Sequence, residues 1–265
     1  MTFNEQKARE IYDNYRFYDR QAVYYPAKDV LFYQSDIRGN LLTAERLQAV
    51  RAILEQEQVT VITTFDALMD KMASLDNIQS GILTYSVGDS MDMEEMKQKL
   101  VQMGYERNYQ IESAGQFAVR GGILDIFPLT EEVPYRIELW GDEIDSIRSF
   151  EVESQRSIEN LEEVRIYPAC EVVLSAEQIT RGLEKIQQET ERLYETFRKE
   201  MKTEEAHRVR KTTEALKEEV TELGLVGNLD SYLGYFLKET VSFLNYFPEQ
   251  ETIIFLDEPA RIAEK

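Results

Sequence analysis

The sequence predicts an α/β protein with an inserted α+β domain: an incomplete parallel sheet, an antiparallel sheet with a helix packed on it, and a helical C-terminal part. Short β-branched strands alternate with amphipathic helices over residues 1–83, which indicates a parallel sheet. Residues 84–170 contain one helix and then at least four strand-like segments separated by turn signals. Residues 171–265 are mostly helical in pattern and are expected to pack with residues 1–83.

The first α/β part begins with a helical segment, "NEQKAREIYDNYRFY", and a short strand that Pro26 ends. An amphipathic helix follows from residue 41, with Thr43 as its expected N-cap. The β-branched run "VTVITT" is the second strand, and a threonine at its end is expected to cap the next helix.

The inserted domain begins with a loop and a helix. Methionines and a leucine recur along this helix at helical spacing, at Met93, Met96, Leu100 and Met103. Glycines in "RGG" and "WGDE" mark tight turns between strands. The four predicted strands are "QFAVR", "ILDIF", "YRIELW" and "SIRSFEV". A further short strand, "LEEVRIYPA", leaves the sheet.

The C-terminal part opens with a long helix capped by Ser175, with Gln178 at the capping-box position. Its expected inner face consists of Ile179, Leu183, Ile186, Leu193 and Phe197. A second, highly charged helix is expected to end at Gly224. The run "TIIFLDEP" is predicted to be a buried strand that stops at Pro259.

Composition narrows the class of protein. The chain of 265 residues is 43% hydrophobic, which is typical of a globular protein, and its net charge of −20 opposes non-specific DNA binding and favours basic partner surfaces. No apolar run approaches the roughly 20 residues that span a bilayer, so we expect no membrane segment. The polar N-terminus is unlike a signal peptide, and the single cysteine fits a cytoplasmic protein.

The sequence favours binding over catalysis. It contains no Gly-Lys pair, so a phosphate-binding P-loop is absent, and Asp257 and Glu258 are best interpreted as a strand end. Cys170 and His207 are the only residues of their kinds and cannot complete a zinc site. We therefore expect no catalytic residues, no metal and no cofactor.

One predicted strand carries the clearest candidate site. Alternation places Tyr135, Ile137 and Leu139 on an apolar face, and it places Arg136 and Trp140, the only tryptophan, on the polar face. If "QFAVR" lies beside this strand, Arg120 joins them. Two arginines and a tryptophan are typical of protein-interface hot spots, and arginine pairs well with carboxylates. The alternative is that Trp140 packs under a neighbouring loop or under the helix of the inserted domain, and that the arginines pair with local acids.

The segment "GQFAVRGGILDIFPLTEEVPYRIELWGDEIDSIRSFEVESQRS" resembles the second domain of the bacterial transcription-repair coupling factors and, more distantly, the matching domain of UvrB. The upstream "VGDSMDMEEMKQKLVQMGYER" and the downstream "IIFLDEPARI" also fit the coupling-factor pattern. The resemblance therefore covers essentially the whole chain and matches the N-terminal UvrB-like module, domains 1a, 2 and 1b.

The resemblance implies a function. Coupling factors are ATP-driven DNA translocases that displace stalled RNA polymerase and recruit UvrA for nucleotide excision repair. Contacts to polymerase and DNA would belong to domains outside this chain. The second domain would dock UvrA through two arginines and an aromatic residue, which fall by motif on Arg120, Arg136 and Trp140. The family often has phenylalanine at the last position.

Two alternatives stay open. One is that the chain is a fragment of a UvrB-like ATP-dependent DNA repair helicase, although the β-hairpin with which UvrB grips DNA does not fit in the short first α/β part. Alternatively, the module also packs on another domain of the full-length protein and so controls access to UvrA. The chain begins at what resembles the family's second strand, so we expect a truncated α/β sheet with an exposed hydrophobic edge.

Overall fold

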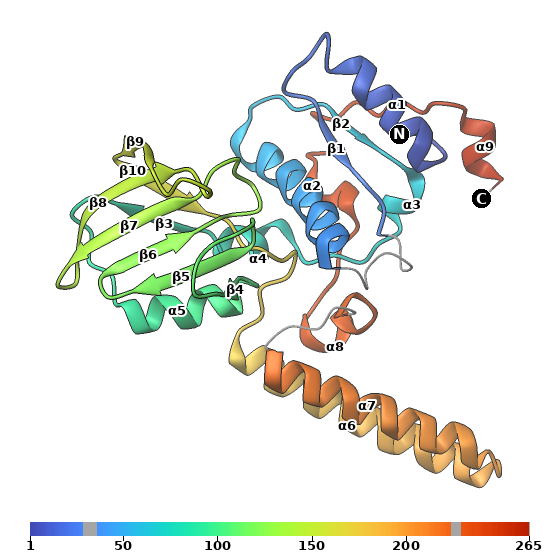
Figure 1. Cartoon of the computed structure of the whole chain (residues 1–265). Coiled ribbons are helices and arrows are strands. Elements are labelled where there is room, and N and C mark those ends of the chain that lie inside the picture. Colours follow the sequence, from blue (N-terminus) through green and yellow to red (C-terminus); the bar gives the residue numbers. More distant parts are fainter. Residues whose placement is uncertain (29–35, 224–228, 265) are drawn as a thin grey trace. The chain divides into compact units, whose positions relative to one another are not determined.

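The computed structural model describes residues 1–28, 36–223 and 229–264 (Figure 1). It is a mixed α/β structure with both parallel and antiparallel strand pairs, as the sequence predicts. The chain divides into two compact units. One unit combines Met1–Val173 with Val241–Lys265, and the other is Leu174–Thr240. Among the described residues, no helix is long and apolar enough to cross a membrane.

The parallel pairing lies near the N-terminus. Strand β1 (Val23–Tyr25) pairs in parallel with β2 (Val61–Thr63), and Thr2 forms a further parallel bridge to Thr64. The helices of this part are α1 (Glu5–Tyr15), α2 (Asp36–Glu55), α3 (Phe65–Leu68) and α4 (Leu75–Ser80). Apolar side chains of α2, α3 and the 3-10 turn η2 (Phe243–Tyr246) bury Tyr25, whose ring stacks on Phe243.

Two predicted helix starts in this part have different outcomes. Thr64 caps α3, because its side chain accepts a hydrogen bond from the Ala67 N–H. The prediction that Thr43 caps the long helix is wrong, since α2 begins at Asp36 and Thr43 lies inside it. Threonine is a residue type that often caps helices, but the helix already includes the segment "DIRGNLL" before Thr43.

The inserted segment forms a six-stranded sheet in the order β4-β5-β6-β7-β8-β9. All four predicted strands are confirmed, and each of the pairs from β5 to β9 is antiparallel. The strands are β4 (Glu106–Arg107), β5 (Gln116–Arg120), β6 (Ile123–Ile126), β7 (Tyr135–Trp140), β8 (Glu143–Phe150) and β9 (Ser157–Leu161). Outside the sheet, β3 (Leu83–Ser86) pairs with β10 (Glu163–Ile166).

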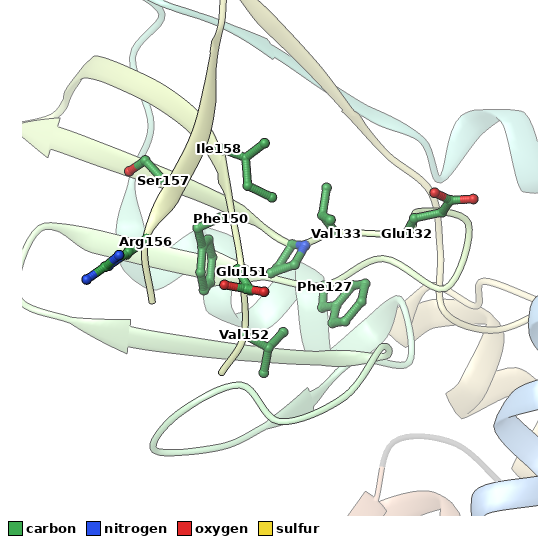
Figure 2. A pocket seen from close by; sticks show the side chains of 10 residues that line it. Phe127, Glu132, Val133, Phe150, Glu151, Val152, Arg156, Ser157 and Ile158 are labelled. Atoms are coloured by element: carbon green, nitrogen blue, oxygen red, sulfur yellow. The ribbon is translucent and has the colours of Figure 1, made fainter. Parts of the chain in front are cut away.

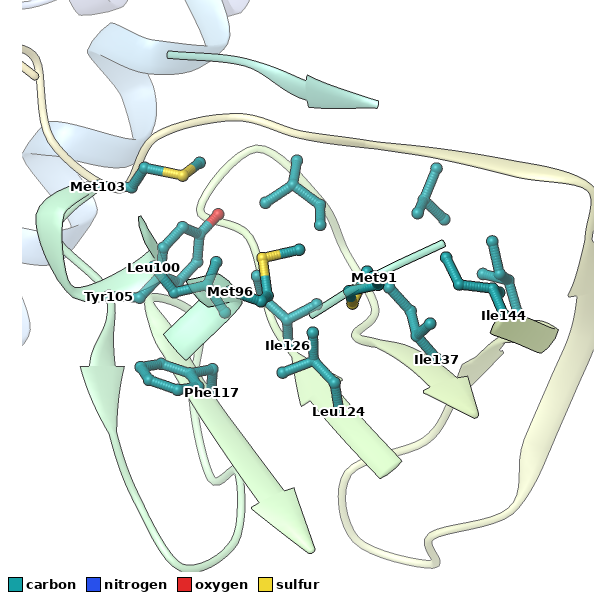
Figure 3. Close-up of a cluster of buried hydrophobic side chains, with 13 residues drawn as sticks. Met91, Met96, Leu100, Met103, Tyr105, Phe117, Leu124, Ile126, Ile137 and Ile144 are labelled. Carbon is teal, nitrogen blue, oxygen red and sulfur yellow. The ribbon is translucent and has the colours of Figure 1, made fainter. Parts of the chain in front are cut away.

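One face of the sheet is covered by α5 (Met93–Gln102), whose side chains Met96 and Leu100 are buried. Figure 3 shows these side chains beside Phe117, Leu124 and Ile126 of the sheet. The helical spacing of the methionines therefore marks a core face, as expected. We call the opposite face of the sheet, away from α5, the outer face.

The second unit is a helical hairpin of α6 (Ala176–Lys199) and α7 (Thr203–Leu223), followed by η1 (Leu229–Tyr232) and α8 (Leu233–Phe236). The predicted capping box is confirmed, because Ser175 and Gln178 exchange hydrogen bonds. The most buried row of α6 is Gly182, Ile186 and Thr190, so the predicted inner position Leu193 is wrong, and its side chain is exposed. The expected stop at Gly224 lies outside the described residues.

The predicted buried strand "TIIFLDEP" is also wrong. Ile253 and Phe255 are 79% and 78% exposed, and the segment forms no strand before α9 (Pro259–Ala263). It is held by the backbone of Met1, whose amino group donates to the Phe255 carbonyl and whose carbonyl accepts from the Asp257 N–H. β-branched residues favour a strand, but burial depends on neighbours in the tertiary structure.

Candidate functional site

The candidate site lies on the outer face of the six-stranded sheet. Along β7, Tyr135, Ile137 and Leu139 contribute to the core under α5, as predicted from their alternation. Arg136 points to the other face, opposite Asp125 of β6 in the strand register. Antiparallel pairing therefore places one carboxylate between the strands that carry the two predicted arginines.

Asp125 joins Arg120 and Arg136. Its Oδ2 accepts from Nη2 of Arg120 at 2.7 Å, and its two oxygens accept from Nε and Nη2 of Arg136 at 2.6 and 2.8 Å. Asp125 is only 1% exposed, so these bonds form away from solvent. Such charge-assisted bonds are among the stronger hydrogen bonds in proteins. The arginines thus pair with a local acid, one part of the alternative that the sequence left open.

The two arginines are held to different degrees. Nη2 of Arg136 also donates to Gln155 at 2.8 Å, and its guanidinium lies 4.3 Å from the centre of the Phe150 ring. The hydrogen bond to Asp125 raises the pKa of Arg136 further above its already high value. The side chain of Arg120 makes a single bond and is 39% exposed, against 15% for Arg136. Arg120 therefore keeps more of its donors available to a partner.

Trp140 does not pack under a loop. It is 85% exposed, and its side chain forms no hydrogen bond, ring contact or cation–π contact within the described part of the chain. The two-residue turn Gly141–Asp142 follows it, and Gly141 has φ of 67°, which suits the first position of a type II′ hairpin. The structure thus brings Arg120 and Arg136 together. Trp140 lies at the end of β7, the strand of Arg136, and does not contact either arginine.

Two residues of the candidate site were missed in the sequence. Asp125 is an acidic residue inside the apolar run "ILDIF", and this could have marked it as the partner of the arginines. Gln155 gives no comparable signal, because it reaches Arg136 only through a turn in which its own φ is 57°.

A hollow of about 400 Å³ lies beside the arginine pair (Figure 2). Its lining residues are mostly apolar: Phe127, Glu132, Val133, Pro134, Phe150, Glu151, Val152, Arg156, Ser157 and Ile158. Phe150 belongs both to this hollow and to the stacking contact under Arg136. The hollow and the arginine pair are therefore neighbouring parts of one surface, which we call the outer-face surface.

The other candidate residues have ordinary surroundings. Burial raises the pKa of the Cys170 thiol to about 12, so Cys170 is a poor nucleophile. Asp257 accepts from Thr2, and Glu258 pairs with Arg261. Within the described residues, no group of three His, Cys, Asp or Glu side chains could hold a metal ion.

Comparison with known proteins finds a family model for one segment and relatives over nearly the whole chain. Residues 83–171 match the family model of the UvrB interaction domain. Over its whole length the chain is 32% identical to the transcription-repair-coupling factor of Bacillus subtilis (strain 168), of which it covers 22%. Identity is 33% to that of Staphylococcus aureus (strain NCTC 8325 / PS 47), covering 95% of the chain and 21% of that protein.

The chain is also 30% identical to UvrABC system protein B of Thermosipho africanus (strain TCF52B), over 97% of its own length and 39% of that protein. It therefore spans about a fifth of the coupling factors and about two fifths of this second relative.

Proposed function

Because this chain belongs to the UvrB-like modules that transcription-repair-coupling factors have in common with UvrABC system protein B, we propose that it is a non-catalytic interaction module that docks UvrA. Within a coupling factor, it recruits UvrA to stalled RNA polymerase for nucleotide excision repair. The docking site is the outer-face surface of the inserted domain, with Arg120, Arg136 and Trp140 as its contact residues.

One observation carries this proposal: Trp140 is 85% exposed at the end of a strand that also presents an ordered arginine. Covering a large exposed apolar side chain with a partner removes much apolar area from water and so contributes strongly to the binding free energy. Tryptophan and arginine are also enriched among hot-spot residues. Arg120 and Arg136 supply charge-assisted hydrogen bonds to carboxylates of the partner. Since Asp125 already orients them, little side-chain entropy is lost on docking.

The proposal is tested by calorimetry of the chain with purified UvrA, beside Trp140→Ala and Arg120→Ala. We expect each variant to lose at least about 2 kcal/mol of binding free energy, the size typical of hot spots. Trp140 is 85% exposed, so the melting temperature of Trp140→Ala should match that of the parent, whereas Arg120→Ala also loses the hydrogen bond to Asp125 and should melt at a lower temperature. Parent-like affinity in both variants would refute the site.

The similarity to UvrABC system protein B keeps the second candidate, a fragment of an ATP-dependent DNA repair helicase, open to test. That function requires nucleotide binding. A rise in melting temperature with Mg-ATP would favour the helicase fragment, and an unchanged melting temperature would favour the interaction module.

A further inference from the structure

The hollow on the outer face is structurally continuous with the arginine pair. The guanidinium of Arg136 lies over the ring of Phe150, and Phe150 also lines the hollow. Gln155, which accepts from Arg136, belongs to the same turn as Val152 and Arg156, two further lining residues. A partner that contacts Arg136 therefore also reaches residues that line the hollow.

The usual size of a protein interface indicates that a partner covers both the arginine pair and the hollow. A stable interface buries about 800 Å² on each partner, roughly 20–30 residues a side. Two partly exposed arginines and one tryptophan provide only a fraction of this, so a UvrA-sized partner must cover neighbouring surface. Further along β7 from Arg136, toward Trp140, Glu138 is already paired with Arg148 of β8. The hollow is the neighbouring surface that is apolar and open.

The lining defines the chemistry of the occupant. Ile158, on β9 at the edge of the sheet, is 57% exposed, and Figure 2 shows Val133, Phe127 and Val152 around the same space. An apolar hollow with a charged rim takes an apolar side chain and leaves polar groups of the partner at the rim. Glu132 and Arg156 lie at this rim and form no ion pair among the described residues.

We propose that UvrA, docked on the outer-face surface, inserts one aliphatic or aromatic side chain into the hollow between Phe127, Val133, Val152 and Ile158. This inference rests on the proposed function and adds a second anchor point, on the far side of Arg136 from Trp140. Burial of apolar area there stabilises the complex, and water leaves the neighbourhood of the Arg136 bonds.

The test is calorimetric binding of the chain to purified UvrA with Ile158→Glu, which places a charge at the mouth of the hollow. Val101→Glu is the matched control. Val101 is also an exposed aliphatic residue of the inserted domain, but it lies on α5, which covers the other face of the sheet. Because both residues are exposed, both variants should melt at the parent temperature. We expect at least tenfold weaker binding for Ile158→Glu and parent affinity for Val101→Glu.

The outcomes separate the two proposals. If Trp140→Ala weakens binding but Ile158→Glu binds as tightly as the parent, the hollow is not an anchor site and the docking function stands. If Val101→Glu weakens binding as much as Ile158→Glu, the effect is general charge repulsion and the inference is overturned. If the parent does not bind UvrA at all, the docking function fails and the inference fails with it.

Discussion

Asp125 decides what the candidate site offers to a partner. Arg120 and Arg136, on the strands either side of β6, would repel each other, but a single carboxylate of β6 that is 1% exposed binds both. The cluster therefore carries a net charge of +1 rather than +2, and its guanidiniums are fixed by short hydrogen bonds. If the proposed site docks an acidic partner, Asp125 would favour docking by orienting the two guanidiniums and would oppose it by reducing their positive charge.

This opposition gives a prediction for Asp125→Asn. The change removes charge-assisted hydrogen bonds, each contributing about 1.5–3 kcal/mol, while it raises the net charge of the cluster by one. If orientation dominates, UvrA affinity measured by calorimetry should fall at least about tenfold, or about 1.4 kcal/mol.

The matched control is Asp145→Asn, which makes the same change of charge at an exposed position of β8. Its affinity should equal that of the parent or exceed it slightly. Tighter binding by Asp125→Asn than by the parent would show that charge, and not orientation, governs the site. A thermal melt of each variant reports any general loss of structure.

At the scale of elements, the start of α6 is fixed by its capping box. The Ser175 side chain accepts a hydrogen bond from the Gln178 N–H, and the Oε1 of Gln178 accepts one from the Ser175 N–H. Ser175→Ala should reduce the free energy of unfolding by about 1 kcal/mol, since it leaves the Gln178 N–H without its partner. Urea unfolding followed by circular dichroism measures the change.

Thr196→Ala provides the comparison, because Thr196 is also a hydroxyl residue of the same element but bonds only the Arg192 carbonyl within the helix. Alanine favours helix more than threonine does, so this variant should be as stable as the parent or more stable. Equal losses in both variants would contradict a specific role for the cap.

The packing of α6 against α8 gives a second prediction for elements. Gly182 is buried, and a Cβ atom there would lie 2.1 Å from Cδ1 of Phe236. Alanine normally stabilises a helix by about 1 kcal/mol relative to glycine. Here the clash should outweigh that gain, so Gly182→Ala should lower the free energy of unfolding by about 1–3 kcal/mol, the usual cost of overpacking.

Gly234→Ala is the matched control for this prediction. Gly234 lies in α8 with open space around it, so the same substitution should leave stability unchanged or raise it. The double variant Gly182→Ala with Phe236→Leu should regain part of the lost stability. A Gly182→Ala variant as stable as the parent would mean that Phe236 moves aside without cost.

At the scale of the molecule, a buried ion cluster connects distant parts of the larger unit. Arg46 of α2 is fully buried and binds Glu171 and Asp70, while Lys28 lies 2.8 Å from Glu171. Glu171 follows the inserted segment, so the cluster joins the returning chain to α2. Burial opposes ionisation of Glu171, but the charges of Arg46 and Lys28 outweigh it and lower its pKa to about 2.

This pKa predicts how stability depends on pH. The pKa of Glu171 falls from its ordinary 4.5 to about 2 on folding, so its contribution is fully present above pH 4.5 and is lost as the pH falls toward 2. The loss amounts to roughly 3 kcal/mol. Asp70, whose pKa burial raises, acts in the opposite direction. Urea unfolding at a series of pH values measures the dependence.

Glu171→Gln separates this cluster from other acids. It leaves Arg46 buried without a full counter-charge, so it should lower stability near neutral pH by about 3–5 kcal/mol and flatten the dependence between pH 4.5 and 2. Glu249→Gln, at an exposed position, should change neither. An unchanged pH dependence in Glu171→Gln would refute the assignment.

The sequence by itself determined the features that depend on local periodicity. Alternation along "YRIELW" assigned both faces of β7, the methionine spacing identified the buried face of α5, and the capping box marked the start of α6. The family followed from the same segments. These signals are visible in sequence because each depends on residues a few positions apart.

Only the tertiary structure decided which residues meet. It paired Asp125 with Arg120 and Arg136, left Trp140 uncovered, and exposed Phe255 although its run is as apolar as a buried strand. It also formed the hollow by bringing Ile158 close to Phe127 and Val133, which belong to an earlier segment of the chain. Strand register and burial depend on neighbours that are distant in sequence, and periodicity within one segment contains no information about them.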